Sequence, residues 1–595
     1  MVSSVENMDL SEIREIAKME LSSLIQRLND GGQKNCAFYV VQELLFYINS
    51  DKELRGLFCR ENGVVGVFPL KDDAELVHAD HAVFLVKTNV EFTRQLARIL
   101  AVYTQKMPNT FLTVFFVPRK TLMIEHIFEN EYQSLLNAAR LNFSDFDWDI
   151  AVLDEDLLSM QMPDSFRQMV LDGDATIQEW SARMLFKLQA SFFGAVPLIR
   201  AKGTNAAKVV NVLRRLQEET ESDCTNDIAS KFDSLFIFDR SLDLVTPTLT
   251  QLTYEGLIDE LYSINAGIVS FPFKLSEESA KETDQQMYLS SSDQLFREIR
   301  DKNFSSVGNI LYSKSIWVKQ CYEKRKEVQE LKELKEYMKT LPEMQELHRL
   351  ICVHTNIATD IGKNTQSIGF QRRITIEQYI VQQINEKEVL NYIEELINKS
   401  APITEVFRLI SLYSLANDGL KSKTYEFFKH ILMLSYGIPY VIVALTCFEK
   451  CGLITIHKDK PATFSSVRKQ FKLWDYNLDE KSPSDVSYAY SGYAPLSLRL
   501  LNELITCPDT WGSSGTLCDI LPGSKAEIRD EFHISGSPSS ILVFFLGGVT
   551  LAEINAIRFL QKRWAELDQP KRIVIATTNV MNGTRMIRSL LPFAD

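Results

Sequence analysis

The sequence has no apolar run long enough to cross a membrane. Its longest runs cover residues 111–118, 440–448 and 541–547, whereas a spanning helix needs about 20 apolar residues. The first 28 residues are acidic, with apolar residues at helical spacing, and they lack the basic start and continuous apolar centre of a secretory signal. We therefore expect any membrane association to be peripheral and to depend on partner proteins.

An excess of positive charge is also absent. Lys and Arg number 65 against 78 Asp and Glu, which gives a formal net charge of −13. A nucleic-acid-binding surface needs a basic stripe, and anionic lipids attract polybasic segments. The charge balance argues against an electrostatic nucleic-acid binder and against strong electrostatic attachment to a membrane.

Cysteine and histidine patterns give no metal site. The nine cysteines are odd in number and scattered, which is typical of reduced thiols. Cys447 and Cys451 have no second Cys or His pair near them in the sequence, and His78 and His81 lack the Glu of the metalloprotease helix motif. We expect no bound metal.

Phosphate-binding and nucleophile motifs are incomplete. Residues 541–560 predict a strand, two glycines and a helix, but the third glycine of the dinucleotide fingerprint is missing. Thr550 and Glu553 there have the spacing of a capping box. Residues 202–208 lack the second P-loop glycine, and residues 511–515 lack the nucleophile-elbow spacing. We expect no catalytic residues and no cofactor, and hence a binding protein. A doubly wound nucleotide-binding enzyme is the alternative, because parallel sheets often carry sites at their strand ends.

The order of expected elements predicts the domain organisation. A chain of 595 residues exceeds one core and should form two to four domains. Strand-like and helix-like segments alternate at first, which predicts parallel α/β sheets. The period then becomes helical, and strands return near the end. We predict two parallel-sheet α/β domains, with a mainly helical third domain inserted into the second. The boundaries are residues 1–137 for the first domain, 138–247 and 484–595 for the second, and 248–483 for the third.

Residues 238–262, FDRSLDLVTPTLTQLTYEGLIDELY, place charges directly after a buried strand. Asp239, Arg240 and Asp243 follow the apolar run, and Pro247 marks the end of the charged stretch. A buried ion is costly unless it is paired. We predict an Asp-Arg-Asp ion network that locks a domain junction and contacts no ligand.

Residues 308–362 predict a helical hairpin. An apolar stripe and opposite charges at helical spacing run over residues 308–339, which is typical of a partly solvated helix. Residues 340–343 have capping-box spacing with a proline in the first turn, so a second helix is expected to begin there. A hairpin that packs wholly on its own domain is an equally good interpretation.

Residues 238–262 and 541–560 closely resemble two signature segments of the SM family. These Sec/Munc-type, syntaxin-binding proteins assemble SNAREs for membrane fusion. The resemblance implies a three-domain arch in which residues 238–262 join the second domain to the third. It also implies that the helical hairpin holds SNARE helices. The expected contact residues flank the predicted turn and are Met338, Leu341, Pro342 and Met344.

Other segments resemble the class C vacuolar branch of this family. The chain also lacks the longer insertion after Leu453 found in the second metazoan paralogue of the branch, which favours the A-type. The resemblance implies a non-enzymatic SM subunit of the HOPS and CORVET tethering complexes, recruited from the cytoplasm to late endosomes and lysosomes or vacuoles. An SM protein of secretory exocytosis is the remaining alternative. The similar segments are residues 117–125, 153–160, 348–358 and 484–505.

The resemblance also implies a partner site. In the class C branch the SM protein joins its complex through vacuolar protein sorting-associated protein 16, which binds the helical domain. The matching stretch is residues 428–454, where an exposed apolar patch would mark the interface. Ile438 stands where an aromatic residue is expected, and Val441 is equally well read as core. The expected contact residues are Lys429, Tyr436, Ile438, Tyr440 and Val441.

Overall fold

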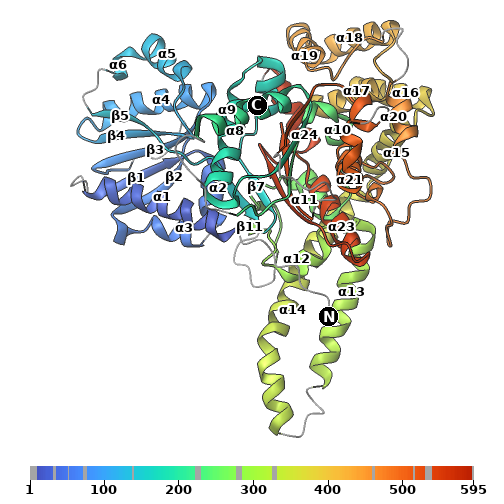
Figure 1. The fold of residues 1–595 in the computed structure, drawn as a ribbon, viewed down its shortest axis with the longest axis horizontal. Coiled ribbons are helices and arrows are strands. Elements are labelled where there is room, and N and C mark those ends of the chain that lie inside the picture. Colours follow the sequence, from blue (N-terminus) through green and yellow to red (C-terminus); the bar gives the residue numbers. More distant parts are fainter. Residues whose placement is uncertain are drawn as a thin grey trace. The chain divides into compact units, whose positions relative to one another are not determined.

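A computed structural model describes most of the chain as two compact units. One unit holds Asn7–Gln161 and Asn265–Ile268, and the other holds Met162–Ile264 and Val269–Asp595. Figure 1 colours both by sequence. The described residues are 10–30, 35–50, 52–71, 77–136, 140–220, 229–275, 285–324, 331–457, 463–512, 516–529 and 539–592.

The first unit is built on a parallel five-stranded sheet with the order β2-β1-β3-β4-β5. Strand β3 is buried along its whole length. The elements are α1 (Ser11–Asp30), β1 (Cys36–Val40), α2 (Gln42–Ser50), α3 (Lys52–Leu57), η1 (Arg60–Asn62), β2 (Val64–Pro69), β3 (His81–Lys87), α4 (Val90–Lys106), β4 (Phe111–Val117), α5 (Leu122–Glu131), α6 (Gln133–Leu136), β5 (Leu141–Asp145), β6 (Ala151–Asp154) and β7 (Leu157–Ser159).

The second unit contains a sheet with the order β12-β8-β9-β13-β14. Its strands β8, β9, β13 and β14 pair in parallel, and β12 pairs antiparallel with β8. The elements around this sheet are α7 (Ser165–Arg167), η2 (Gln168–Asp172), α8 (Thr176–Leu188), η3 (Gln189–Phe193), β8 (Leu198–Lys202), α9 (Thr204–Thr220), β9 (Ser234–Asp239), η4 (Arg240–Leu242), β12 (Lys525–Arg529), β13 (Ser540–Leu546), α23 (Leu551–Glu566), β14 (Arg572–Thr577) and α24 (Gly583–Leu590).

A mainly helical region lies between β9 and β12 in the sequence, and Figure 1 shows its hairpin α13–α14 projecting from the rest of the unit. The elements are α10 (Val245–Thr248), α11 (Tyr254–Tyr262), β10 (Ile268–Phe271), β11 (Gln285–Tyr288), α12 (Gln294–Ile299), α13 (Phe304–Lys324), α14 (Leu331–Thr365), α15 (Ile368–Gln382), α16 (Glu386–Asn398), α17 (Ile403–Ala416), α18 (Ser422–Tyr436), α19 (Ile438–Lys450), α20 (Thr463–Gln470), η6 (Val486–Tyr490), α21 (Leu496–Thr506), η7 (Pro508–Gly512) and α22 (Leu517–Ile520).

The pairing of β9 with β13 decides the topology. Leu235 of β9 lies opposite Leu542 of β13 in parallel register, so the helical region leaves the sheet after β9 and the chain later returns to it. Both strands are buried over nearly their whole length. The predicted fold class, two parallel-sheet α/β regions with helices inserted into the second, is confirmed. The exact boundaries of the three predicted domains stay predictions.

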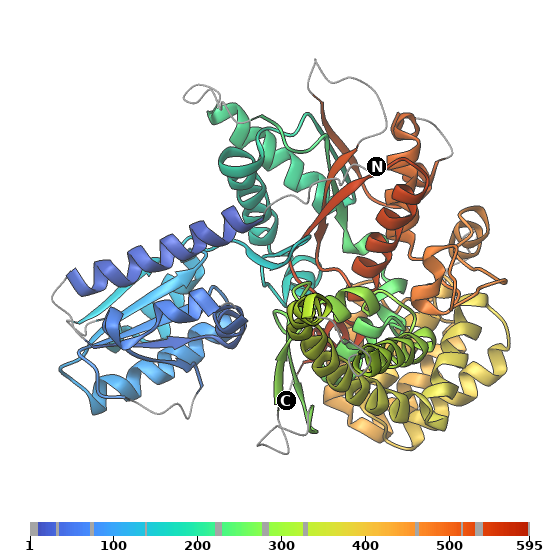
Figure 2. The ribbon, with the colours of Figure 1, turned by 90° about the horizontal axis from the view of Figure 1, so that it is seen from below.

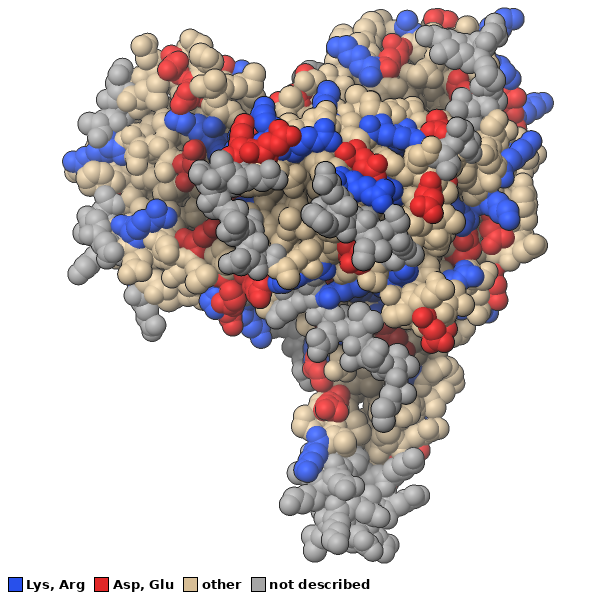
Figure 3. Space-filling view, in the orientation of Figure 1, with Lys and Arg blue, Asp and Glu red and all other residues tan. Residues whose placement is uncertain are grey.

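The surface carries mixed charge. In Figure 3, Lys and Arg alternate with Asp and Glu over the visible face. None of the helices that the structure describes combines the length and hydropathy of a membrane span. Within the same residues, no three His, Cys, Asp or Glu side chains gather where they could hold a metal ion.

Candidate functional sites

The charged signature segment forms a closed, buried junction around Arg240. This side chain leaves the end of β9 and is 1% exposed. Its Nη1 donates to both carboxylate oxygens of Glu553 at 3.1 and 2.8 Å, and its Nη2 donates to the Asp243 carbonyl at 2.6 Å. Burial alone would lower the pKa of Arg240, but the charges of Glu553 and Asp243 outweigh it and raise the pKa. The guanidinium therefore stays charged inside the fold.

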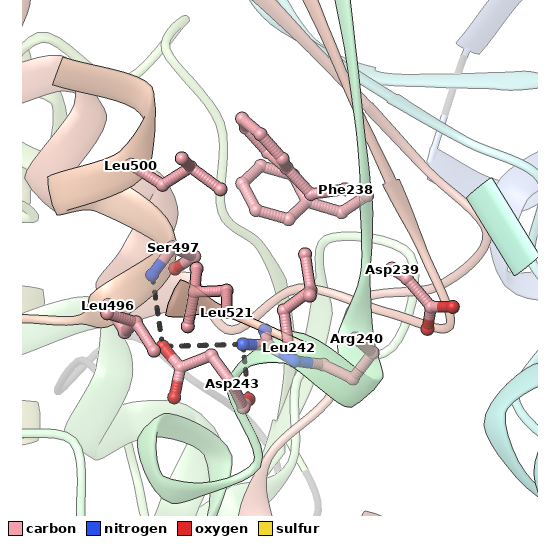
Figure 4. Close-up of a pocket in the computed structure, with 10 residues that line it drawn as sticks. Phe238, Asp239, Arg240, Leu242, Asp243, Leu496, Ser497, Leu500 and Leu521 are labelled. Carbon is pink, nitrogen blue, oxygen red and sulfur yellow. Dashed lines mark hydrogen bonds and ion pairs between the residues drawn. The ribbon is translucent and has the colours of Figure 1, made fainter. Parts of the chain in front are cut away.

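The two carboxylates around Arg240 are satisfied by further donors. Glu553 belongs to the capping box of α23, where it accepts from the Thr550 N–H at 3.0 Å. It also accepts from the Ser497 hydroxyl at 2.5 Å. Asp243 accepts from the Thr246 N–H at 3.0 Å and from the Ser497 N–H at 3.2 Å. Figure 4 shows Asp243 lying between Arg240 and Ser497.

Asp239 has a different role from the one predicted. It points away from Arg240 in Figure 4, and its carboxylate accepts from the Ser241 N–H at 3.0 Å and from the Asn205 N–H at 2.9 Å. Asn205 lies in the first turn of α9. The predicted Asp-Arg-Asp network is therefore corrected to a network of Arg240, Asp243 and Glu553, because Asp239 is committed to backbone amides.

The positions where a phosphate would bind are filled by the protein itself. Asp239 occupies the N-terminal end of α9, and a Cβ on Gly203 would lie 2.3 Å from the Asp239 Cβ. At the other glycine turn, a Cβ on Gly548 would lie 2.8 Å from the Met581 sulfur. In the first turn of α23, the Ala552 N–H donates to Gln251 at 2.8 Å. Helix N-terminal amides hold phosphates only when they are free, so neither turn offers a nucleotide site.

The cavity at the junction is also too small for a ligand. It measures about 10 Å³ and is lined mainly by Leu and Phe side chains around Arg240. That volume corresponds to about one water molecule. Pro247 is buried in α10, next to this network. That the signature segment is structural and contacts no ligand stays a prediction.

A second buried ion pair, which the sequence reasoning missed, fastens α11. Arg408 on α17 pairs with Glu260 at 2.9 Å and donates to the Thr248 and Leu249 carbonyls at 2.8 and 2.7 Å. Burial would lower the pKa of Arg408, but Glu260 outweighs it and raises that pKa. The sequence pattern gives no sign of this ion pair, because Arg408 differs from a surface arginine only in being buried in the folded protein.

Helices α18 and α19 expose an apolar surface near the predicted partner residues. We call this surface the α18–α19 patch; its members are Phe427, Leu434, Ile438, Ile442 and Val443, which are between 43% and 73% exposed. Of the predicted contacts, Ile438 lies in the patch at 58% exposed, whereas Val441 is fully buried. Val441 is therefore core, which corrects its placement on the surface. The reason is helical geometry: successive residues of a helix point in directions about 100° apart, so Val441 faces the core while Ile442 and Val443 are exposed.

The other predicted partner residues surround this patch. Lys429 and Tyr436 are half-buried. The Lys429 ammonium lies 5.9 Å from the centre of the Tyr425 ring, and the Tyr436 hydroxyl donates to the Ala401 carbonyl at 2.6 Å. Tyr440 is also half-buried. These contacts hold Lys429 and Tyr436 in fixed positions at the edge of the exposed residues.

The helical hairpin is confirmed, but its turn is elsewhere. Helix α14 runs without a break from Leu331 to Thr365, with Pro342 inside it. The capping box predicted at residues 340–343 is therefore wrong, and the connection between the helices falls on residues 325–330, outside the described residues. Pro342 is exposed and lies inside this long helix, where it removes one backbone hydrogen bond.

The shifted turn changes the place of the predicted SNARE contacts. Leu341 is half-buried and Pro342 is exposed, whereas Met344 is 6% exposed and packs in the hairpin. The prediction that Met344 is a surface residue beside the turn is therefore wrong. The side chain of Met338 lies outside the described residues.

A groove opens between the two hairpin helices. Its volume is about 1110 Å³. Val318 and Ile351 form its apolar floor and are buried, and the Tyr322 ring lies 6.3 Å from His348 across the helix pair. Tyr312 and Trp317 of α13 are also 68% and 50% exposed. The polar lining residues include Lys319, Glu323, Glu346 and Arg349.

Comparison with known proteins identifies the family. The sequence model of the Sec1 family matches residues 57–589. The chain belongs to the Sec1 family. Vacuolar protein sorting-associated protein 33A of Rattus norvegicus is 34% identical over 554 residues, which cover 89% of this chain and 90% of that protein. The vacuolar protein-sorting-associated protein 33 homolog of Arabidopsis thaliana is 33% identical over 527 residues, 86% of each chain.

The Sec1-family assignment confirms the resemblance to SM proteins, and the vacuolar relatives confirm the branch. A B-type relative, vacuolar protein sorting-associated protein 33B of Danio rerio, is 26% identical over 635 aligned positions that cover 98% of this chain and 97% of that protein. The higher identity of the Rattus A-type protein agrees with the missing insertion after Leu453.

Solved Sec1-family structures share the fold. The SM protein Vps45 in complex with the Qa SNARE Tlg2 (1–310) has a TM-score of 0.56 at 17% identity, covering 96% of this chain and 97% of that one. The Unc18–syntaxin 1 complex from Monosiga brevicollis has a TM-score of 0.55 at 14% identity, covering 96% and 98%. At these identities the likeness concerns the fold.

Proposed function

We propose that this Sec1-family protein binds SNARE helices and promotes their assembly as the SM subunit of HOPS and CORVET tethering complexes. Two facts support this: its similarity to vacuolar protein sorting-associated proteins 33 over nearly the whole chain, and its fold, shared with SM proteins solved in SNARE complexes. It would act from the cytoplasm on late endosomes and lysosomes or vacuoles, without a cofactor and without catalysis.

The groove of the α13–α14 hairpin carries this proposal. An amphipathic helix binds a groove through apolar residues spaced three and four apart. The groove has the required chemistry, with Val318 and Ile351 on its floor and charged residues of both signs beside them. The proposed contact surface is therefore the groove and its lining, which includes Pro342, rather than the end of the hairpin; Leu341 is the residue next to Pro342 in α14. Met344 supports it from within the helix pair.

A second surface fits the tethering subunit. The α18–α19 patch exposes five large apolar side chains, and exposed apolar clusters mark interfaces. We place vacuolar protein sorting-associated protein 16, or its equivalent, on this patch, with Ile438 among its contact residues. Lys429, Tyr436 and Tyr440 form the surrounding contacts, and Val441 supports the patch from inside.

The test is affinity purification of the full chain from its own cells. The proposed function predicts that tethering subunits co-purify with it, together with vacuolar or lysosomal SNAREs. Recovery of a plasma-membrane syntaxin without tethering subunits would favour the secretory SM alternative. The nucleotide-binding alternative is tested by thermal denaturation with ATP, GTP, NAD and NADP, because a bound ligand raises the melting temperature. Unchanged melting in all four is expected.

A further inference from the structure

The α13–α14 hairpin is joined to its unit through polar contacts buried at its root. His354 of α14 is fully buried. Its Nδ1 lies 3.0 Å from the Tyr254 hydroxyl, and its Nε2 lies 3.0 Å from the Asp293 carboxylate. Burial would raise the pKa of Asp293, but hydrogen bonds from His354 and from the Phe296 N–H lower it. Asp293 is thus ionised and accepts a hydrogen bond from the His354 Nε2–H.

The chain of Tyr254, His354 and Asp293 joins three separate elements. Tyr254 is the first residue of α11, Asp293 caps the N-terminus of α12, and His354 belongs to α14. The His354 ring also stacks on Phe296, with the ring centres 5.9 Å apart and an interplanar angle of 11°. The position and the tilt of α14 are therefore both fixed at this point.

A second contact lies farther along α14. The Tyr262 hydroxyl, at the last residue of α11, donates to Asp360. Helix α11 is itself held by the Arg408–Glu260 pair and by a bond at 3.0 Å from Asn582 to the Asp259 carbonyl. The two ends of α11 thus contact two successive stretches of α14. Two such contacts resist rotation of α14 better than a single contact does.

The length of the hairpin amplifies any change at its root. From His354 to Leu331, α14 extends for roughly 35 Å at 1.5 Å per residue. A tilt of about 10° would move its far end by about 6 Å over such a length. Helix recognition in a groove depends on several contacts in register, so a shift of that size would disturb a partner that also contacts other parts of the protein.

We propose that the chain of Tyr254, His354 and Asp293 and the bond between Tyr262 and Asp360 together form a root clamp that sets the angle of the α13–α14 hairpin. They are positioning residues for SNARE binding, and they touch no SNARE themselves. The expected effect on SNARE binding rests on the proposed function. The expected effect on the hairpin angle does not depend on the proposed function.

The test uses the double variant Tyr254→Phe with Tyr262→Phe in the full chain, because it removes two hydroxyls and keeps both rings. Spin labels at the exposed residues Lys339 and Lys387 report the distance from the hairpin to α16. The matched control is Tyr103→Phe, which removes a buried hydroxyl that donates to the Val77 carbonyl in the other unit. Tyr254→Phe alone serves as the milder variant if the double variant is poorly folded.

The clamp predicts a shifted or broadened distance distribution in the Tyr254 variants and an unchanged one in the control. Affinity for a soluble SNARE helix should fall about fivefold or more in the same variants, with binding to the tethering subunit unchanged. An unchanged distance distribution would overturn the clamp, whatever the SNARE affinity. If substitutions in the groove leave SNARE binding intact, the proposed function is wrong. The distance between the spin labels still tests the clamp in that case.

Discussion

Arg240 and Glu553 are 313 residues apart in the sequence, yet the Arg240 Nη1 lies 2.8 Å from a Glu553 oxygen inside the fold. The pair joins the end of β9 to the start of α23, the two segments that carry the family signatures. Because Glu553 also completes the capping box of α23, one carboxylate serves both the local helix and the distant junction. The two signature segments therefore act as one structural unit.

Arg240→Ala should destabilise the protein strongly. It leaves two buried carboxylates without their cation, and breaking a buried ion pair costs about 3–5 kcal/mol. Melting temperature should fall, and binding to SNAREs and to the tethering subunit should weaken together. The control is Arg499→Ala, which removes a half-exposed pair with Asp485 and should cost about 1 kcal/mol or less. Loss of only one binding activity at unchanged melting temperature would show that Arg240 contacts a ligand.

Ile438→Asp and Val441→Asp should behave differently although they are three residues apart. Ile438 is 58% exposed and Val441 is fully buried. The first variant should keep its melting temperature and lose the tethering subunit, because a charge in an apolar interface is unpaired. The second should unfold or aggregate, because a buried unpaired charge is costly. A folded Val441→Asp protein that lacks only tether binding would show that the burial of Val441 is not needed for folding.

Charges placed in the hairpin groove should reduce SNARE binding. We expect Gln345→Asp combined with Cys352→Asp, two exposed residues of the groove lining, to weaken the affinity for a SNARE helix by about tenfold, which corresponds to about 1.4 kcal/mol. Tether binding should remain. Thr359→Asp is the matched control, since Thr359 is exposed on α14 and is absent from the groove lining. Met344→Asp, in contrast, should destabilise the hairpin. Equal SNARE affinity in the double variant and the control would exclude the groove as the contact surface.

Pro342→Ala should stabilise α14. Proline inside a helix removes a backbone hydrogen bond and costs about 3 kcal/mol, and Pro342 is exposed within a continuous helix. Amide hydrogen exchange around residues 338–346 should slow in the variant, with little change in α15. Faster exchange would mean that Pro342 supports the helix through its contacts in the groove.

Acidic pH should weaken the first unit through His81. This side chain is buried and its Nε2 lies 2.8 Å from the Thr113 hydroxyl; burial lowers its pKa from 6.5 to about 4. The unfolded chain takes up the proton near pH 6.5 and the folded chain only near pH 4. Stability is therefore full above pH 6.5 and falls as the pH drops, by up to about 3 kcal/mol.

The measurement for His81 is hydrogen exchange of β3 and β4 at pH 7 and pH 5, corrected for the intrinsic pH dependence of exchange. Protection should decrease at pH 5, and His81→Gln should remove much of that pH dependence. Equal pH dependence in both proteins would contradict a role for His81.

The pattern of the sequence predicted the elements that depend on local rules. Alternating apolar strands and amphipathic helices gave the two α/β regions, and the spacing of Thr550 and Glu553 gave a capping box that the structure contains. The helical period of residues 308–362 gave the hairpin. These features depend on residues within one or two turns of each other, or within one strand.

Pro342 shows where local rules failed. The capping-box spacing of Thr340 and Glu343, with Pro342 in the first turn, predicted a new helix, but packing of a long α14 against α13 overrides that preference. Propensities of this kind are weak compared with the burial of side chains such as Met344 and Ile351. The sequence therefore placed the hairpin correctly and its turn wrongly.

The sequence by itself determined the fold class and the family, because signature segments and apolar periodicity are local. Only the tertiary structure decided which partner each charge has and which apolar residue is exposed. Arg240 bonds to Glu553 rather than to Asp239, Val441 is core while Ile438 is surface, and His354 lies buried between Tyr254 and Asp293. Each of these depends on contacts between segments that are distant in the chain, and burial and pairing arise only when those segments meet.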